Sequence, residues 1–368
     1  MKFSELAELY EKLDATPKKL EKRDILAVFY KNLKDSDLYR AVVLSSGYVF
    51  SQGEEELGIA EGMVKRVIQR VAGATEKEVV DKFKTTGDLG LAAETLMEKR
   101  KQKPLLSKTL TVDMVFDNLR KLPEITGEGS QEKKVALISE LLSAATPKEA
   151  RYIVRTTLGQ MRIGVAWGTI RDALAKAFER EPKEVEHLFN MVGDYGKVAE
   201  RAKSGKMAAS MELFRPVRVM LADRGGDDIK AAVESFEKPA IEIKYDGFRV
   251  QIHKDKNKVV IFSRRMEDVT RQFPDIVEWS KESIKASNCI VDGEAVAFDF
   301  ARNRAFPFQH LSRRIQRKYD IEKMTEEVPV QVNLFDIIYH EGENIMNKPM
   351  KERWALLKKI IKENEEKK

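Results

Sequence analysis

The stretch Glu242–Arg249 (EIKYDGFR) gives the clearest indication of chemistry in this chain. It contains a lysine shortly before an Asp-Gly pair. Side chains alternate along a β-strand. We therefore expect Glu242 and Lys244 to share one face of a strand. The apolar Ile241 and Ile243 would then take the other face, against the core. This pattern predicts that Lys244 lies at the end of the strand, beside an Asp-Gly turn, and points into a cleft.

The amine of such a lysine is a nucleophile only when it is deprotonated. Partial desolvation and nearby cations favour the neutral form. Arg249, Arg264 and Arg265 could supply this positive field, which would also hold a triphosphate. Taken alone, a lysine before Asp-Gly is also typical of a solvated hairpin turn with a surface lysine, so both interpretations stay open for this stretch.

Three further stretches carry the residue types that a covalent nucleotidyl transfer needs. Val291–Glu294 (VDGE) is predicted to be a second turn that leads an acidic residue into an apolar strand. Phe262–Arg265 (FSRR) supplies arginines, and Leu334–Ile337 (LFDI) places an aromatic ring inside a strand. The transfer requires a nucleophilic lysine, an aromatic ring for the base, a carboxylate for the ribose or a metal, and arginines for phosphates. Neither common glycine-rich phosphate loop, GxxxxGK[ST] or GxGxxG, occurs in the chain.

The elements that must position these residues change character along the chain. Residues 1 to about 210 read as successive amphipathic helices, with start signals such as the Thr75–Glu78 capping box and Pro147 at a first helical position. Pro216 and a Gly-Gly pair then read as a linker. Beyond it, the predicted strands are Ile241–Ile243, Phe248–His253, Val259–Ser263, Cys289–Phe298 and Val330–Ile338, and the predicted helices lie near 227–236, 268–286 and 349–364. We predict a multidomain fold, an all-α domain at 1–210 followed by an α+β domain at 211–368.

Length, charge and cysteine content limit the class of protein. The 368 residues predict two or three domains at roughly 100–200 residues each. The net charge of +6 permits a polyanionic partner without demanding one, since acidic and basic residues are mixed. A single cysteine, Cys289, excludes an intrachain disulfide and favours a reducing compartment, and the four histidines lack zinc-ligand spacing. No apolar run approaches the roughly 18 residues of a spanning helix, which argues against a membrane protein.

The stretches KYDGFR, FSRR, VDGEAVAF and NLFDIIY resemble motifs I, Ia, III and IIIa of the ATP-dependent DNA ligases, most closely the archaeal replicative ones. The helical half is similar to the DNA-binding domain of that family at Thr86–Gly90, Gly127–Ser130 and Gln160–Gly164. Motif I is shared with capping enzymes and RNA ligases, whereas the helical domain with its QMRIG stretch is more specific. The resemblance covers essentially the whole chain. It implies a DNA-binding domain followed by a nucleotidyltransferase (adenylation) domain.

The resemblance also implies a reaction and its cofactors, ATP and Mg²⁺. Lys244 would attack the α-phosphate of ATP, form a lysyl-AMP phosphoramidate and release pyrophosphate. The AMP would pass to the 5′-phosphate of a nick in duplex DNA. The 3′-hydroxyl would then displace AMP and seal the strand, in replication, repair and recombination.

Motif matches assign roles to the residues around this lysine. Glu242 would contact the adenine and Phe335 would stack on it. Arg249 and Arg264 would hold ribose or phosphate oxygens. Glu294 would serve the ribose or the catalytic magnesium.

Two glycine-containing stretches precede predicted helix starts in the helical half. At Gly127–Ser130 and Gly164–Thr169, free backbone amides and the helix dipole would attract anions, although ordinary helix capping is the alternative. Such contacts hold the DNA backbone without reading bases. With the resemblance, the predicted DNA contacts are Gly129, Ser130, Lys133, Lys134, Arg162, Gly164 and Thr169.

A basic segment, Lys99–Leu106, offers a second interaction. With Gln102, Leu105 and Leu106 it resembles the sliding-clamp-binding segment of archaeal ligases, which usually carries two aromatics there, and an exposed linker is the alternative. The expected partners are therefore nicked double-stranded DNA and the replication sliding clamp, with no membrane. We expect a monomer in the cytoplasm, associated with the nucleoid.

The chain also departs from the family pattern. Motifs IV, V and VI and the C-terminal oligonucleotide-binding (OB) domain are missing, so we expect a truncated chain that is impaired in self-adenylation. An RNA ligase or capping-type enzyme shares the lysine chemistry but does not explain the helical half. A nick-binding scaffold without catalysis is the other alternative. An NAD-dependent ligase is disfavoured because one cysteine cannot build its four-cysteine zinc site.

Overall fold

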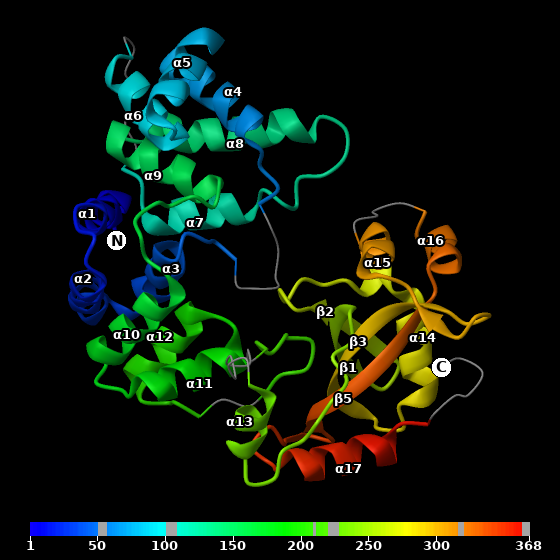
Figure 1. The fold of residues 1–368 in the computed structure, drawn as a ribbon. Coiled ribbons are helices and arrows are strands. Elements are labelled where there is room, and N and C mark those ends of the chain that lie inside the picture. Colours follow the sequence, from blue (N-terminus) through cyan, green and yellow to red (C-terminus); the bar gives the residue numbers. More distant parts are fainter. Residues whose placement is uncertain (51–56, 101–108, 209–210, 220–227, 316–319, 363–368) are drawn as a thin grey trace. The chain divides into compact units, whose positions relative to one another are not determined.

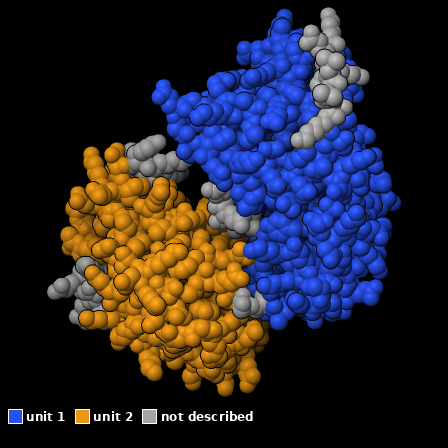
Figure 2. All heavy atoms as spheres, turned by 180° about the vertical axis from the view of Figure 1, so that it is seen from behind, with its two compact units in different colours: residues 1–209 blue, residues 210–368 orange. Residues whose placement is uncertain are grey.

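The computed structural model describes residues 1–50, 57–100, 109–208, 211–219, 228–315 and 320–362. The chain divides into two compact units, Met1–Ala209 and Ser210–Lys368, which Figure 2 colours separately. Each unit is considered by itself. Among the helices of the described ranges, none has the length and apolar character needed to cross a membrane.

The first unit is built of helices (Figure 1). Their bounds are α1 Phe3–Asp14, α2 Lys19–Asn32, α3 Asp35–Ser45, α4 Glu61–Ala72, α5 Glu76–Thr86, α6 Leu89–Glu98, α7 Val112–Arg120, α8 Ser130–Ala144, α9 Pro147–Thr157, α10 Trp167–Ala177, α11 Pro182–Val192 and α12 Tyr195–Ser204. The helix starts follow the sequence signals: Thr75 and Glu78 form the predicted capping box of α5, and Pro147 occupies the first turn of α9.

A buried ion pair joins α6 to α9 in this unit. Arg155 donates from Nε and Nη2 to one oxygen of Asp88, at 2.9 and 2.7 Å, while the other oxygen accepts from the Gly90 amide at 2.7 Å and caps α6. A Cβ at Gly90 would come 2.7 Å from the Arg151 carbonyl oxygen, so the two helices meet there at a distance that only glycine allows. Burial opposes ionisation of Asp88, yet Arg155 and the helix amides hold its pKa below the ordinary value.

The second unit is built on an antiparallel sheet with helices. Its strands are β1 Phe248–Asp255, β2 Lys258–Ser263, β3 Asn288–Asp299, β4 Arg304–Ala305, β5 Val330–His340 and β6 Glu343–Asn344, and its helices are α13 Ile229–Glu234, α14 Pro274–Ser283, α15 Phe308–Ile315, α16 Ile321–Glu327 and α17 Met350–Ile360, with a 3₁₀ turn at Thr270–Gln272. The strand order is β2-β1-β3-β5-β6, and β4 pairs with β3. Antiparallel strands of this kind present one face to a core and leave the other for polar side chains.

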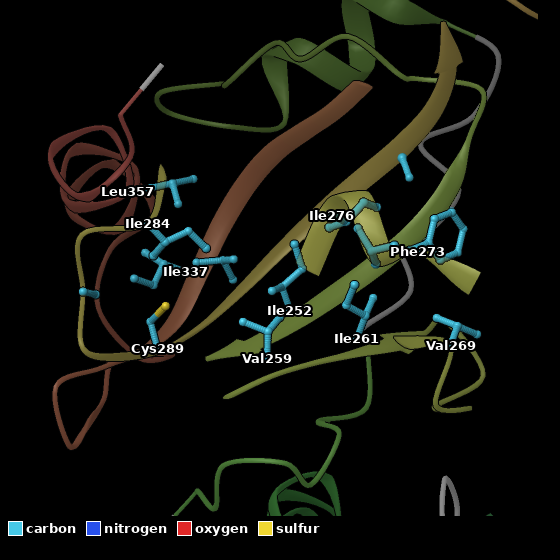
Figure 3. Close-up of a cluster of buried hydrophobic side chains, with 14 of the residues drawn as sticks. Ile252, Val259, Ile261, Val269, Phe273, Ile276, Ile284, Cys289, Ile337 and Leu357 are labelled. Atoms are coloured by element: carbon cyan, nitrogen blue, oxygen red, sulfur yellow. The ribbon is translucent and has the colours of Figure 1, made fainter. Parts of the chain in front are cut away.

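One face of the sheet packs against α14 and α17, as Figure 3 shows. Ile252 of β1, Cys289 of β3 and Ile337 of β5 lie in this core with Ile276 of α14 and Leu357 of α17. Because side chains alternate along each strand, the residues between these core positions face the opposite side of the sheet.

The helical half followed by an α+β half is confirmed, and so are four of the five predicted strands. The fifth, at Ile241–Ile243, is wrong. Among the described residues no strand pairs with positions 241–246, and Ile241 and Ile243 are 87% and 74% exposed instead of facing the core. The helices α15 and α16 were not predicted.

Candidate functional site

The Lys244 segment is extended but lies outside the sheet. Lys244 and Glu242 are both exposed. The prediction that Lys244 ends a strand beside an Asp-Gly hairpin turn is wrong, because pairing with β3 begins only at Phe248. Because Lys244 is exposed, the expected partial desolvation of its amine is not seen.

Gly247 brings this segment against β3. A Cβ at Gly247 would lie 2.4 Å from the Ala295 carbonyl oxygen and 2.9 Å from Glu294 Cγ, so no other residue fits. The Gly247 amide also donates a hydrogen bond to the Glu294 carboxylate. Burial raises the pKa of Glu294, and the nearby cations Lys244 and Arg249 oppose that rise. The structure therefore brings Lys244 and Glu294, two of the predicted site residues, close together.

The VDGE stretch is not the predicted turn but lies inside β3. Its register against β5 shifts between Ile290 and Val291 and again between Asp292 and Gly293. A Cβ at Gly293 would lie 2.8 Å from Leu334 Cδ2, so this glycine allows β5 to approach closely. An Asp-Gly pair, usually a turn signal, is accommodated here because the irregular register of the strand needs the glycine.

Arg249 joins three strands on the polar face of the sheet. Its Nη2 donates to Asp292 Oδ2 at 3.0 Å, and its guanidinium carbon lies 5.3 Å from the ring centre of Phe335. Phe335 lies between Leu334 and Asp336, which pair with Gly293 and Asp292, so Phe335 is the extra residue of the irregular stretch. Two predicted site residues, Arg249 and Phe335, are thus in contact.

Two buried donors on this side of the molecule lack acceptors. The Nε of Arg249 and the Nδ2 of Asn333 have no hydrogen-bond partner among the described residues. Asn333 pairs in register with Glu294. Buried donors without acceptors are costly, and an oxygen-rich ligand would satisfy them.

Sequence reasoning missed Asp292, Gln251 and His253. Asp292 is buried, and burial raises its pKa although Arg249 opposes the rise. Gln251 accepts from the Val217 amide at 2.7 Å and donates to the Val217 carbonyl at 3.1 Å, so it fixes the segment that enters this unit. The polar residues between the apolar ones of VQIHK were the signal that could have found them.

His253 completes this network. Its Nδ1 accepts from the Phe214 amide at 3.0 Å, so the proton lies on Nε2, which donates to Gln251 Oε1 at 3.0 Å. Burial lowers the pKa of His253 to about 3 and keeps the ring neutral. Phe214 itself has a left-handed φ of 64°.

The other two residues predicted to bind the nucleotide, Arg264 and Glu242, are not joined to this group by the contacts of the described residues. Arg264 follows β2 in the turn after Ser263 and is exposed. Within the described ranges, neither Arg264 nor Glu242 forms a hydrogen bond or ion pair with Lys244, Arg249 or Glu294. In the same ranges no three His, Cys, Asp or Glu side chains gather into a preformed metal site.

In the helical unit, the first predicted DNA-contact loop precedes α8. Gly129 has φ 73° and caps α8 without a side-chain hydrogen bond, and Ser130 begins the helix. Lys133 is exposed and Lys134 is half-buried. This places two cations beside the helix start, as predicted.

The second predicted loop connects α9 to α10. Arg162 is exposed and has an unusual φ of 55°, and Gly164 has φ 64°. The loop is anchored from beneath, because the buried Lys22 ammonium donates to the Ile163 carbonyl. Thr169 is only 9% exposed, which leaves its side chain little surface for a DNA contact. The clamp residues Gln102, Leu105 and Leu106 lie outside the described residues.

Comparison with known families gives two matches along the chain. Residues 2–175 match the family described as DNA ligase N terminus, and residues 219–368 match the ATP dependent DNA ligase domain.

Comparison with curated proteins gives archaeal relatives named DNA ligase. The chain is 47% identical to the protein of Nanoarchaeum equitans over 99% of this chain, and 40% identical to those of Thermococcus onnurineus and Archaeoglobus fulgidus over the same share. It spans 65%, 66% and 66% of the lengths of these relatives. With these matches along both units, the chain belongs to the family of ATP-dependent DNA ligases.

Proposed function

We propose that this chain carries out ATP-dependent nick sealing in duplex DNA, through adenylate carried on Lys244. One observation supports this most directly. Gly247 lies against β3, the charges of Lys244 and Arg249 both act on Glu294, and the Arg249 guanidinium lies against the Phe335 ring. A nucleophilic amine, a carboxylate, a guanidinium and an aromatic ring are the groups that a covalent nucleotidyl transfer requires.

In the proposed reaction, neutral Lys244 Nζ attacks the α-phosphorus of ATP. A phosphorus–nitrogen bond forms, the bond from that phosphorus to the pyrophosphate oxygen breaks, and the amine loses a proton. The 5′-phosphate at the nick then takes the AMP from Lys244, and the 3′-hydroxyl displaces AMP to close the strand. The exposure of Lys244 leaves its amine accessible to both ATP and the 5′-phosphate.

The side chains around Lys244 would hold the nucleotide. The unpartnered Arg249 Nε is free to donate to a ribose or phosphate oxygen, and Phe335 presents a ring on which adenine can stack. Glu242 would contact the adenine, and Arg264 would reach the phosphates from the end of β2.

The residues also fit a magnesium ion. Mg²⁺ is commonly held by one or two carboxylates together with substrate phosphates. Glu294 is a half-buried carboxylate near Lys244, so it would hold the ion. When bound, Mg²⁺ would supply positive charge to the leaving pyrophosphate.

We assign residues 1–210 to DNA binding and residues 211–368 to nucleotidyl transfer. Contacts to the duplex backbone would come from Gly129, Ser130, Lys133, Lys134, Arg162, Gly164 and the Thr169 region. The sliding clamp would bind through Gln102, Leu105 and Leu106. From the family relation we further propose a monomer that acts on nucleoid DNA in the cytoplasm.

Mass spectrometry after incubation with ATP and Mg²⁺ tests the first step. We expect a single AMP adduct that maps to Lys244. Lys244→Arg keeps the positive charge but offers no competent amine, so it should carry no adduct. An adduct on another residue, or one that survives in Lys244→Arg, would contradict the assignment. Joining of a labelled nicked duplex by the same sample tests the later steps.

A further inference from the structure

Four aromatic rings pack together in a cluster between the core of the helical unit and its surface. Phe189 of α11 lies 3.8 Å from Tyr195 of α12, Tyr195 lies 5.4 Å from Trp167 at the start of α10, and Trp167 lies 5.5 Å from Tyr48, measured between ring centres. Trp167 also lies 5.9 Å from Phe189, and the planes of neighbouring rings are within 27° of parallel. Phe189 is buried, whereas Tyr48 is 50% exposed. In the described part of the chain no ring other than Trp167 stacks on Tyr48, so this aromatic cluster ends at a half-exposed ring.

The Tyr48 end of this aromatic cluster borders a hollow of about 330 Å³. Tyr48 and Trp167 line it together with the loop that carries Arg162 and Gly164. Arg162 is the only charged side chain among the described residues that line it. Gly47 has φ 84°, and a Cβ there would lie 2.8 Å from Met161 Cγ, so this glycine lets the two loops meet.

The loop that presents Arg162 is held rigidly from below. Lys22 donates to the Ile163 carbonyl, and Arg155 Nη1 donates to the Met161 carbonyl at 3.2 Å. The left-handed φ of Arg162 is a strained conformation for a side chain of this size, and such strain persists only where the surroundings fix it. Among the described residues, the hydrogen bond of the guanidinium is to Gln160 Oε1 of its own loop, at 3.5 Å and on the surface.

We propose that Tyr48 and Arg162 together bind one sugar-phosphate unit of the duplex, with Arg162 on the phosphate and the Tyr48 ring on the deoxyribose. In an intact duplex the base faces are covered by their neighbours, whereas the sugar rings remain accessible along the groove. The half-exposed Tyr48 ring would pack on the apolar face of a deoxyribose, and the Arg162 guanidinium would pair with the negative charge of the adjoining phosphate. This inference rests on the proposed function and assigns Tyr48, which lies outside the ligase motifs of the sequence.

The two halves of this contact differ in their dependence on salt, and that difference provides the test. A phosphate contact releases counterions and contributes about 0.9 to the slope of log K against log salt concentration, whereas an aromatic contact contributes nothing to the slope. Binding of the 368-residue chain to a fluorescent nicked duplex is measured by anisotropy over a range of salt concentrations. The variants are Tyr48→Ala, Tyr48→Phe and Arg162→Ala, and Leu20→Ala serves as a control for the loss of an exposed apolar side chain elsewhere on the unit.

We expect Tyr48→Ala to weaken binding about tenfold at every salt concentration without changing the slope. Tyr48→Phe, which keeps the ring, should restore binding to within about twofold. Arg162→Ala should lower the slope by about 0.9. The circular dichroism of each variant shows whether it is folded, and Tyr48→Leu, which keeps an apolar side chain without a ring, takes the place of Tyr48→Ala if that variant does not fold.

Two outcomes would overturn the inference alone. In the first, Tyr48→Ala binds like the wild-type chain or like Leu20→Ala. In the second, Tyr48→Phe binds as weakly as Tyr48→Ala, so that the ring is irrelevant. A wild-type chain that shows no salt-dependent affinity for nicked duplex would instead overturn the proposed function, and the inference with it.

Discussion

The Arg162 loop of the helical unit and the Lys244 segment of the sheet unit are built in opposite ways. The Arg162 loop is fixed by buried side chains, Lys22 and Arg155, that donate to its carbonyl groups. The segment from residue 228 to Lys244 has no buried residue, and its close contact with β3 comes after it, at Gly247. A loop that must match the regular spacing of phosphates gains from being formed in advance. A lysine that must reach first ATP and then a 5′-phosphate gains from a flexible approach.

The largest expected effect comes from removing a side chain that anchors the Arg162 loop. Arg155→Met should lower the free energy of unfolding of the helical unit by about 3–5 kcal/mol, because it leaves Asp88 as a buried carboxylate without its partner. Urea unfolding followed by circular dichroism measures the loss. Arg171→Met, which removes a partly exposed pair with Asp172, should cost less than about 1 kcal/mol. Similar losses for the two variants would show that the buried pair does not anchor the loop.

The fixed end of the Lys244 segment can be disturbed by one methyl group. Gly247→Ala places a Cβ 2.4 Å from a backbone oxygen of β3, and we expect the rate of AMP attachment to Lys244 to fall about a hundredfold. Time courses of adduct formation by mass spectrometry measure this rate. Gly62→Ala, where a Cβ meets nothing within 4 Å, is the matched control and should leave the rate unchanged. An unaltered rate in Gly247→Ala would remove the contact with β3 from the proposed site.

Acid should weaken the sheet unit through His253. Burial lowers its pKa to about 3 in the folded chain. Below pH 6.5 the imidazole is therefore protonated in the unfolded state while it stays neutral in the folded state. Stability contributed by the neutral ring is therefore complete above pH 6.5 and is lost as the pH falls toward 3. Between pH 7 and pH 5 this loss is about 2 kcal/mol, measured by denaturant unfolding. His253→Asn keeps an acceptor for the Phe214 amide and should flatten this slope; an equal slope in the variant would contradict the assignment.

The smallest expected effect concerns the α8 start. Lys133→Ala should weaken binding to nicked duplex a few-fold and reduce the salt slope by about 0.9, equally for different duplex sequences. Lys19→Ala, an exposed lysine outside both predicted loops, should change neither quantity. A loss that depends on duplex sequence would indicate base contacts and not backbone contacts.

Local signals in the sequence determined much of this architecture. The capping box at Thr75 and the alternating apolar residues of β1, β3 and β5 depend on neighbours a few positions away, so spacing alone predicts them. The prediction failed at Ile241–Ile243, where the side chains alternate as in a strand but no strand pairs with them among the described residues.

The site residues that the sequence did not predict were missed for a different reason. VDGE reads as a turn locally, yet it is a strand because β1 and β5 flank it. Gln251 and His253 hold backbone groups that lie 34 and 39 positions away in the chain, and no local pattern records such a contact. The family motifs assigned Arg249 and Phe335 to one predicted site, and the contact between them required the fold.

The hydrogen bond between His253 and position 214 has a consequence for how freely that position can change. His253 accepts a hydrogen bond from the main-chain amide there, and the φ of 64° suits glycine better than any other residue. A selection from a library randomised at Phe214 should therefore accept many side chains, enrich glycine, and reject proline, which has no amide hydrogen and a φ locked near −65°. Such tolerance at position 214 would come from the backbone geometry that His253 holds, since it is the main-chain amide that donates to the ring.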